Sequence, residues 1–106
     1  MERVNILGVG ISAINMEDAL DAIAKRLESE VKGYICISNV YSIMEAQRSE
    51  SLKRVLNESF LTTPDGVPTV WLGHFAGFSK MGRVYGPDLM LRTCEWSVGK
   101  GYTHYL

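Results

Sequence analysis

Three short segments carry side chains that could do chemistry, and each borders an apolar run. Asp65 stands between a proline and a glycine, Asn39 follows a run rich in isoleucine, and Arg83 and Asp88 flank the start of a later apolar segment. A carboxylate can accept a proton from a sugar hydroxyl, and an arginine can hold a diphosphate through forked hydrogen bonds. These residues therefore point to chemistry on a hydroxylated, phosphorylated ligand.

Asp65 has the most informative neighbours. The proline before it fixes φ, Gly66 permits an otherwise strained turn after it, and Pro68 suits the first turn of a following helix. The positive end of that helix would stabilise the carboxylate as an anion. The same residues also form a Pro-Asp-Gly turn, which is a common turn sequence with no function of its own. From the residues alone, both interpretations stay open.

The other candidates also have structural alternatives. Asn39 can contact a polar ligand, or it can form an Asx turn or cap a helix that begins at Tyr41. Arg83 can be a surface or ion-paired residue, and Asp88 can be a helix cap or an acid in a first helical turn. Four aromatic residues are expected in a core or an interface rather than in a sugar-stacking platform: Trp71, Phe75, Phe78 and Trp96.

The elements that must position these residues follow from apolar periodicity and from glycine and proline placement. Strands are predicted at 4–10, 34–40, 60–63 and from 102 onward, and helices at 15–33, 41–59 (broken once), from 68 and at 86–101. Alternating strands and helices predict an α/β fold, a Rossmann-like parallel sheet built from βαβ units with helices on both faces. Ligands of such sheets bind beyond the carboxyl ends of the strands, where Asn39 and Asp65 are placed.

Individual residues predict where the helices begin and end. Asn15 is the expected N-cap of the first helix and Gly33 its stop. Ser49 or Ser51 is the expected internal cap between the two halves of the second helical segment. The strand at 34–40 is expected to be buried, because it is rich in β-branched residues.

Composition excludes several classes of protein. The 106 residues carry 11 Lys+Arg against 12 Asp+Glu, a formal charge of −1, so no basic footprint for nucleic acid is present. The longest apolar runs are short and the start does not resemble a signal peptide, so a cytoplasmic location is expected. Two cysteines and two histidines stand apart, which favours reduced thiols and no metal site: Cys36, Cys94, His74 and His104.

The segment Gly8-x-Gly10-x-x-Ala13 is a variant of the dinucleotide-binding fingerprint. That fingerprint needs a helix that begins at the glycines, whereas the first helix is predicted to begin near Met16. A domain that binds the nicotinamide cofactor NAD(P) is therefore a less favoured alternative. A second alternative is a non-catalytic interaction module, in which the edge of the predicted sheet pairs with another chain and gives a homo-oligomer.

The whole chain resembles the bacterial WecG/TagA/CpsF family of glycosyltransferases. The resemblance is carried by "VNILGVGISAINMEDALDAI", by the strand that ends in Asn39, by "TTPDG" at 62–66 and by "RVYGPDLM" at 83–90. The pairing of the last two motifs is more specific than either one alone. It favours the catalytic interpretation of Asp65 over the simple turn.

The resemblance implies an inverting, metal-independent transfer without a cofactor, in the synthesis of cell-surface polysaccharide or teichoic acid. The donor would be UDP-linked N-acetylmannosamine or a related N-acetylhexosamine, and the acceptor a sugar on a polyprenyl diphosphate. Asp65 matches the family's catalytic base. The residues that match substrate-binding positions or lie within the two motifs are Asn39, Thr63, Gly66, Arg83, Gly86 and Asp88.

Two departures from the family pattern qualify this interpretation. Gly82 stands where the family usually has an acidic residue before the arginine. Relatives run to roughly twice this length, which is within the usual size of a single domain. We therefore expect residues 1–106 to be the N-terminal portion of a longer glycosyltransferase with a sheet that is incomplete at its C-terminus. Peripheral contact with the inner face of the plasma membrane would then use a C-terminal segment outside this sequence.

Overall fold

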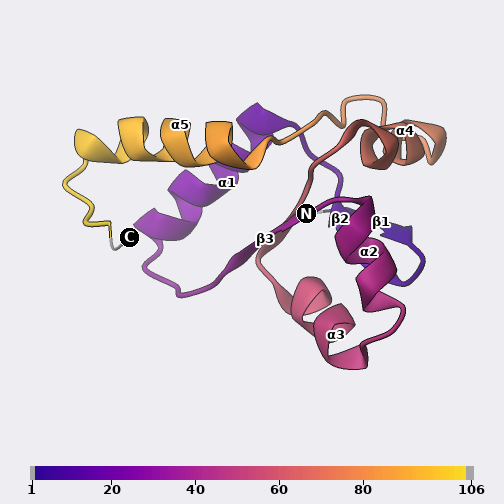
Figure 1. Cartoon of the computed structure of the whole chain (residues 1–106). Helices are drawn as coiled ribbons and strands as arrows, with labels where there is room; N and C mark the ends of the chain where they lie inside the picture. Colours follow the sequence, from indigo (N-terminus) through magenta and orange to yellow (C-terminus); the bar gives the residue numbers. More distant parts are fainter. Residues whose placement is uncertain (1, 105–106) are drawn as a thin grey trace.

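A computed structural model describes residues 2–104 as an α/β fold with helices around two small sheets (Figure 1). The described elements, in chain order, are β1 (Arg3–Ile6), β2 (Val9–Ser12), α1 (Met16–Glu28), β3 (Ile35–Ser38), α2 (Val40–Ala46), α3 (Glu50–Glu58), β4 (Leu61–Pro64), α4 (Val67–Phe75) and α5 (Gly86–Val98). No helix among these residues is both long enough and apolar enough to cross a membrane.

The first predicted strand is wrong, because residues 4–10 form two strands. β1 and β2 pair antiparallel around a turn at Leu7 and Gly8, whose φ angles are +51° and +87°. Tight hairpin turns of this kind need positive φ at both central residues, and a glycine adopts it without steric cost. Since Gly8 turns the chain back into a strand and not into a helix, the nicotinamide-binding alternative loses the geometry that it requires.

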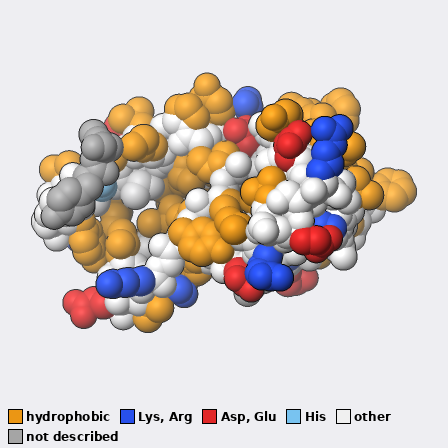
Figure 2. All heavy atoms as spheres, turned by 60° about the horizontal axis from the view of Figure 1, so that its bottom comes forward, with side chains coloured by type: hydrophobic (Ala, Val, Ile, Leu, Met, Phe, Trp, Pro, Cys, Tyr) orange, Lys and Arg blue, Asp and Glu red, His pale blue; other side chains and the backbone are white. Residues whose placement is uncertain are grey.

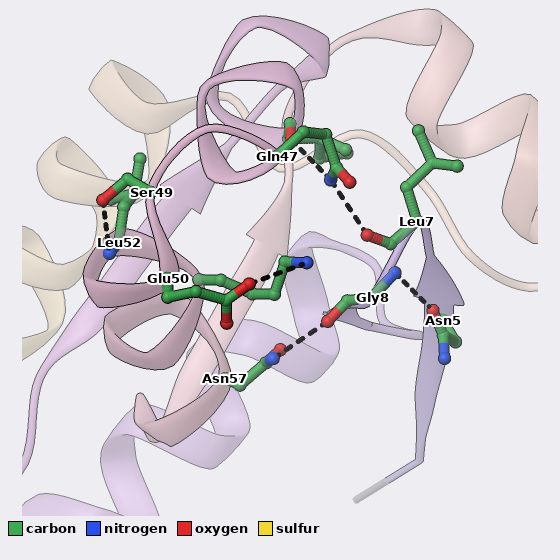
Figure 3. Close-up of polar contacts among 10 residues, drawn as sticks. Asn5, Leu7, Gly8, Gln47, Ser49, Glu50, Leu52 and Asn57 are labelled. Atoms are coloured by element: carbon green, nitrogen blue, oxygen red, sulfur yellow. Dashed lines mark hydrogen bonds and ion pairs between the residues drawn. The ribbon is translucent and has the colours of Figure 1, made fainter.

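Side chains from two helices hold this turn in place (Figure 3). Gln47, which follows α2, donates to the Leu7 carbonyl at 2.9 Å, and Asn57 of α3 donates to the Gly8 carbonyl at 2.9 Å. Asn57 also accepts from the Gly10 N–H at 2.8 Å. The hairpin is thereby fixed to the helices that lead into β4.

β3 and β4 form the parallel pair that the sequence predicts. They are joined through α2 and α3, with Cys36 opposite Thr62 and Ser38 opposite Pro64. The parallel arrangement is confirmed for this pair only, because the other sheet of the described residues is the antiparallel hairpin. A doubly wound, Rossmann-like sheet is not formed by residues 2–104.

The predicted fourth strand is not present in its described part. Residues 102–104 have no strand pairing; Tyr102 instead stacks on Trp96 with ring centroids 5.7 Å apart. His104 Nε2 lies 2.6 Å from the Ser97 hydroxyl, so the chain turns back onto α5. Residues 105 and 106 of that predicted strand lie outside the described part.

Two hydrophobic clusters form the core, one on each side of the site-bearing strands. The first joins the hairpin to α2 and α3 and contains Val4, Ile6, Val9, Ile11, Ile43, Ala46, Leu56 and Met81. The second joins α1 and α5 to β4 and contains Ile14, Ala19, Ala22, Ile23, Leu61, Val84 and Leu89. Every residue of β4 is buried, so this strand is the most constrained part of the sheet.

Most predicted helix boundaries are confirmed. Asn15 caps α1 in a capping box with Asp18, and Ser49 caps α3 through the Leu52 N–H. The helix predicted at 86–101 begins at Gly86 and ends at Val98. The predicted stop of α1 at Gly33 is wrong: the helix ends at Glu28, five residues earlier.

β3 differs from its predicted burial. Ile35 is 37% exposed and Ile37 is 46% exposed, whereas Ser38 is fully buried. Only β4 pairs with β3 among the described residues, so the other edge of β3 has no strand partner there. A space-filling view of one face of the molecule shows many hydrophobic side chains on the surface (Figure 2).

Arg3 connects the hairpin to the start of β4. Its guanidinium donates to the Gly10 carbonyl at 2.9 Å, to Thr62 Oγ1 at 3.0 Å and to the Ser59 carbonyl at 2.6 Å. No carboxylate among residues 2–104 forms an ion pair with it. Arg3 therefore acts as a multiple hydrogen-bond donor that fixes β4 against the hairpin.

We predict that Arg3→Met lowers the free energy of unfolding by about 2–3 kcal/mol, because the methionine keeps the apolar stem but leaves buried acceptors without a donor. Denaturant titration followed by circular dichroism measures this. Arg54→Met, on the exposed side of α3, is the matched control and should change stability by less than about 0.5 kcal/mol. Equal stability of the two variants would show that the Arg3 contacts contribute nothing.

Candidate functional site

The end of β4 positions Asp65. Its backbone N–H donates to the Ser38 carbonyl at 2.9 Å, which extends the β3–β4 pairing by one residue. Gly66 then turns the chain into α4 with φ +95°, a conformation that a side chain would strain. The Asp65 side chain therefore leaves the sheet at the carboxyl edge, where 19% of it is exposed.

Arg83 reaches Asp65 from a segment that is itself anchored on both sides. The Gly82 N–H donates to the Ile14 carbonyl at 3.2 Å, and the Val84 N–H donates to the Pro64 carbonyl at 2.7 Å. Arg83 Nε then donates to Asp65 Oδ1 at 3.0 Å. The ion-paired alternative for Arg83 is thus correct, and its partner is the other leading candidate residue.

The Asp65–Arg83 pair leaves donors and an acceptor free. Only Nε of the guanidinium bonds the carboxylate, and no other hydrogen bond of Arg83 occurs among residues 2–104. Half of the Arg83 side chain is exposed. The terminal amino groups of Arg83 and the second oxygen of Asp65 can therefore contact a ligand without separation of the pair.

Tyr85 also belongs to this group, although the sequence analysis did not single it out. Its ring centroid lies 4.6 Å from the guanidinium carbon of Arg83, within the range of a cation–π interaction. The spacing was the one signal in the sequence: residues two apart point to the same side where the backbone is extended, and Tyr85 has an extended backbone.

Asn39 is the N-cap of α2 and lies beside the turn that carries Asp65. Its Oδ1 accepts from the Ser42 N–H at 3.1 Å, and its own N–H donates to Ser42 Oγ at 3.0 Å. A Cβ added to Gly66 would lie 3.9 Å from the Asn39 Cβ, so the two segments are neighbours. The helix-cap alternative is therefore correct, and the side-chain amide still has its N–H₂ group available.

The remaining candidates from the sequence have different positions. Thr63 is fully buried on β4, with Oγ1 3.4 Å from the Cys36 carbonyl, so its side chain supports the sheet. Gly86 is the first residue of α5, and a Cβ there would lie 2.9 Å from Ile37 Cδ1, the end of a flexible side chain that would have to shift. Asp88 is exposed in the first turn of α5, without a cap bond to the helix start.

Cys36, on β3, is a poor candidate for a nucleophile. Burial raises the pKa of its thiol above the usual value, and neither the Ser59 hydrogen bond nor the Arg3 charge offsets that effect. The thiolate, which is the reactive form, is correspondingly scarce near neutral pH.

The larger surface cavities lie away from this group. One of about 640 Å³ lies between the segment before β3 and the end of α3, one of about 590 Å³ lies along α1, and one of about 470 Å³ lies between the end of α1 and the start of β3. Within residues 2–104, no three His, Cys, Asp or Glu side chains are grouped as metal ligands. Asp65, Arg83 and Asn39 instead form an open edge at the carboxyl ends of the parallel strands.

Comparison with known proteins identifies the family. No curated protein matches the chain. The model of the glycosyl transferase WecG/TagA/CpsF family matches residues 4–106. This range contains all residues of the candidate site. The chain therefore belongs to the WecG/TagA/CpsF family of glycosyl transferases and has a glycosyltransferase role in cell-surface polysaccharide synthesis.

Proposed function

We propose that the protein transfers an N-acetylhexosamine-type sugar, N-acetylmannosamine or a related one, from a UDP donor to a polyprenyl-diphosphate-linked acceptor. The observation that supports this most directly is the Asp65–Arg83 pair, which joins a proton acceptor to a diphosphate-binding group at 3.0 Å. Both groups that such a transfer requires, a base for the acceptor hydroxyl and a cation for the leaving diphosphate, are then at one edge of the sheet.

In this proposal, Asp65 is the general base. Its free oxygen accepts the proton of the acceptor hydroxyl as that oxygen attacks the anomeric carbon. The bond to UDP breaks on the opposite face of the sugar, so the configuration at that carbon inverts. The new glycosidic bond forms, and UDP leaves with the electron pair of the broken bond.

Arg83 stabilises the leaving group in this scheme. Negative charge develops on the UDP diphosphate as the bond breaks, and a guanidinium can bind two of its oxygens at once. The free amide N–H₂ of Asn39 lies beside the turn at Gly66 and would donate to the sugar or phosphate. Because Arg83 supplies the positive charge, the proposed transfer is independent of metal and cofactor. Gly66, Gly86 and Thr63 shape the backbone around the site, and Asp88 would contact a hydroxyl of the ligand.

We propose further that residues 1–106 are the N-terminal portion of the transferase. A lipid-linked acceptor places the reaction at the inner face of the plasma membrane, which we propose is reached through a C-terminal segment beyond this sequence.

The role of Asp65 predicts that Asp65→Asn lowers turnover by about 10²–10⁴, the range expected for loss of a positioned base. Turnover is measured on the whole gene product, with a UDP-sugar and a polyprenyl-diphosphate-linked acceptor. Asp21→Asn, on the exposed side of α1, is the matched control and should keep normal turnover. A near-normal rate for Asp65→Asn, with unchanged circular dichroism, would reject the base assignment.

The role of Arg83 predicts that Arg83→Lys lowers kcat/KM by about 10²–10³, the loss typical for one preorganised charge-stabilising donor. A lysine keeps the charge but presents no planar fork, so it should not rescue the activity. Inhibition by UDP should weaken in the same variant. Should Arg83→Lys retain both activity and UDP inhibition, a point charge at this position would be sufficient and the forked contact would be excluded.

A second candidate is association with another chain, and a specific observation favours it. Ile35 and Ile37 on β3 are partly exposed, and Trp71 and Phe75 on α4 are 66% and 92% exposed. Figure 2 shows hydrophobic side chains over much of one face. Exposed aromatic residues and an unpaired strand edge are typical of surfaces that other polypeptides cover.

We predict that this chain forms a homo-oligomer through the exposed β3 edge and that Ile37→Lys shifts it toward the monomer. Light scattering coupled to size-exclusion chromatography measures the mass. Val98→Lys, at a residue of α5 that is 78% exposed, is the control and should leave the mass unchanged. A wild-type chain that stays monomeric over a wide concentration range would contradict this prediction.

A further inference from the structure

We propose that Tyr85 is a positioning residue of this site, an inference that rests on the proposed function of Arg83 and Asp65. The ring of Tyr85 would hold the Arg83 guanidinium in a single orientation, in which Nε serves the base and the terminal amino groups face an incoming diphosphate. The starting observations are the 4.6 Å distance between the guanidinium carbon and the ring centroid and the 3.0 Å bond between Nε and Asp65 Oδ1.

The two contacts restrain different directions of the guanidinium. An aromatic ring attracts a guanidinium through the π face, whereas hydrogen bonds use N–H groups at the edge of the guanidinium plane. Tyr85 therefore does not compete with Asp65 or with a ligand for Arg83 donors. The ring limits tilting of the plane, and the Nε bond limits its rotation, so the terminal amino groups keep their direction.

The backbone makes Tyr85 a firm support. One residue earlier, the Val84 N–H donates to the Pro64 carbonyl at 2.7 Å. The Tyr85 carbonyl accepts from the Leu89 N–H at 2.9 Å in the first turn of α5. Val84 is fully buried. Tyr85 is thus held between a strand contact and a helix start, while 42% of the residue stays exposed.

This support matters because Arg83 is long and half exposed. A free arginine side chain loses rotamer entropy when it binds an anion, whereas a restrained one has lost most of it in advance. Tyr85 should therefore increase the affinity of the site for a diphosphate without contact between its ring and the ligand. The hydroxyl of Tyr85 is not needed for this effect, so phenylalanine should replace it.

The experiment titrates this chain with inorganic pyrophosphate and follows the Nε–H resonance of Arg83 by nuclear magnetic resonance. We expect Tyr85→Phe to bind within about twofold of the wild type and Tyr85→Leu to bind about two- to fivefold more weakly, the range for one exposed cation–π contact. Tyr85→Trp should bind at least as tightly as the wild type, because tryptophan is the best partner for a cation. Phe75→Leu is the control. It removes an aromatic ring of α4 that is 92% exposed, and the affinity for pyrophosphate should be unchanged.

The outcomes separate this inference from the proposed function. Unchanged binding in Tyr85→Leu, or an equal loss in Tyr85→Phe and Tyr85→Leu, would overturn the role of the ring. If the wild type does not bind pyrophosphate, the proposed diphosphate-binding role of Arg83 is wrong. The Nε–H resonance of Arg83 then still tests whether Tyr85 positions the guanidinium. A distinct, slowly exchanging Nε–H signal in the wild type, Tyr85→Phe and Tyr85→Trp but not in Tyr85→Leu supports positioning; the same signal in all four rejects it.

Discussion

The site depends on one buried strand, β4, and on the backbone hydrogen bonds at its carboxyl end. The Ser38 carbonyl accepts from the Asp65 N–H, and the Pro64 carbonyl accepts from the Val84 N–H. The end of β3, the end of β4 and the segment before α5 therefore meet at this edge. A buried backbone group that loses its partner costs about 1–3 kcal/mol, which makes each of these bonds expensive to break. The directions of the side chains at this edge follow from that constraint.

Burial on both sides gives β4 this role. Leu61 packs into the cluster around α1, while Thr62 meets the hairpin through Ser12 and Arg3. The strand cannot slide by one residue, since a slip would exchange the side chains of its two faces. The position of Asp65 relative to the sheet is therefore fixed. This rigidity is a property of the scaffold and is independent of what binds there.

The polar groups at the edge form a connected set with unused capacity. The carboxylate, guanidinium and amide of the site each make one hydrogen bond within the described part of the chain and retain further donors or acceptors: Asp65, Arg83 and Asn39. Half of the Arg83 side chain is exposed, and exposed ion pairs contribute only about 0–1 kcal/mol to stability. A prearranged pair that can still bind a ligand is what charge stabilisation during group transfer requires.

Local sequence determined the elements that have strong capping or turn signals. Asn15 and Ser49 begin their helices, Pro68 lies in the first turn of α4, and Gly66 turns the chain after Asp65, as their residue types predict. These features depend on contacts a few residues apart, so sequence alone is sufficient for them. Asp65 and Arg83 belong to the two family motifs, and the fold brings these two residues into contact.

Only tertiary structure decided which groups meet and which are exposed. An apolar run predicted as one strand is a hairpin, whose turn at Leu7 and Gly8 contacts Gln47 and Asn57, two residues distant in sequence. The exposure of β3 and the contact of Arg83 with Asp65 likewise depend on which segments pack together. Residue types determine local backbone geometry, whereas partners far apart in the chain are selected by the free energy of the whole packed arrangement.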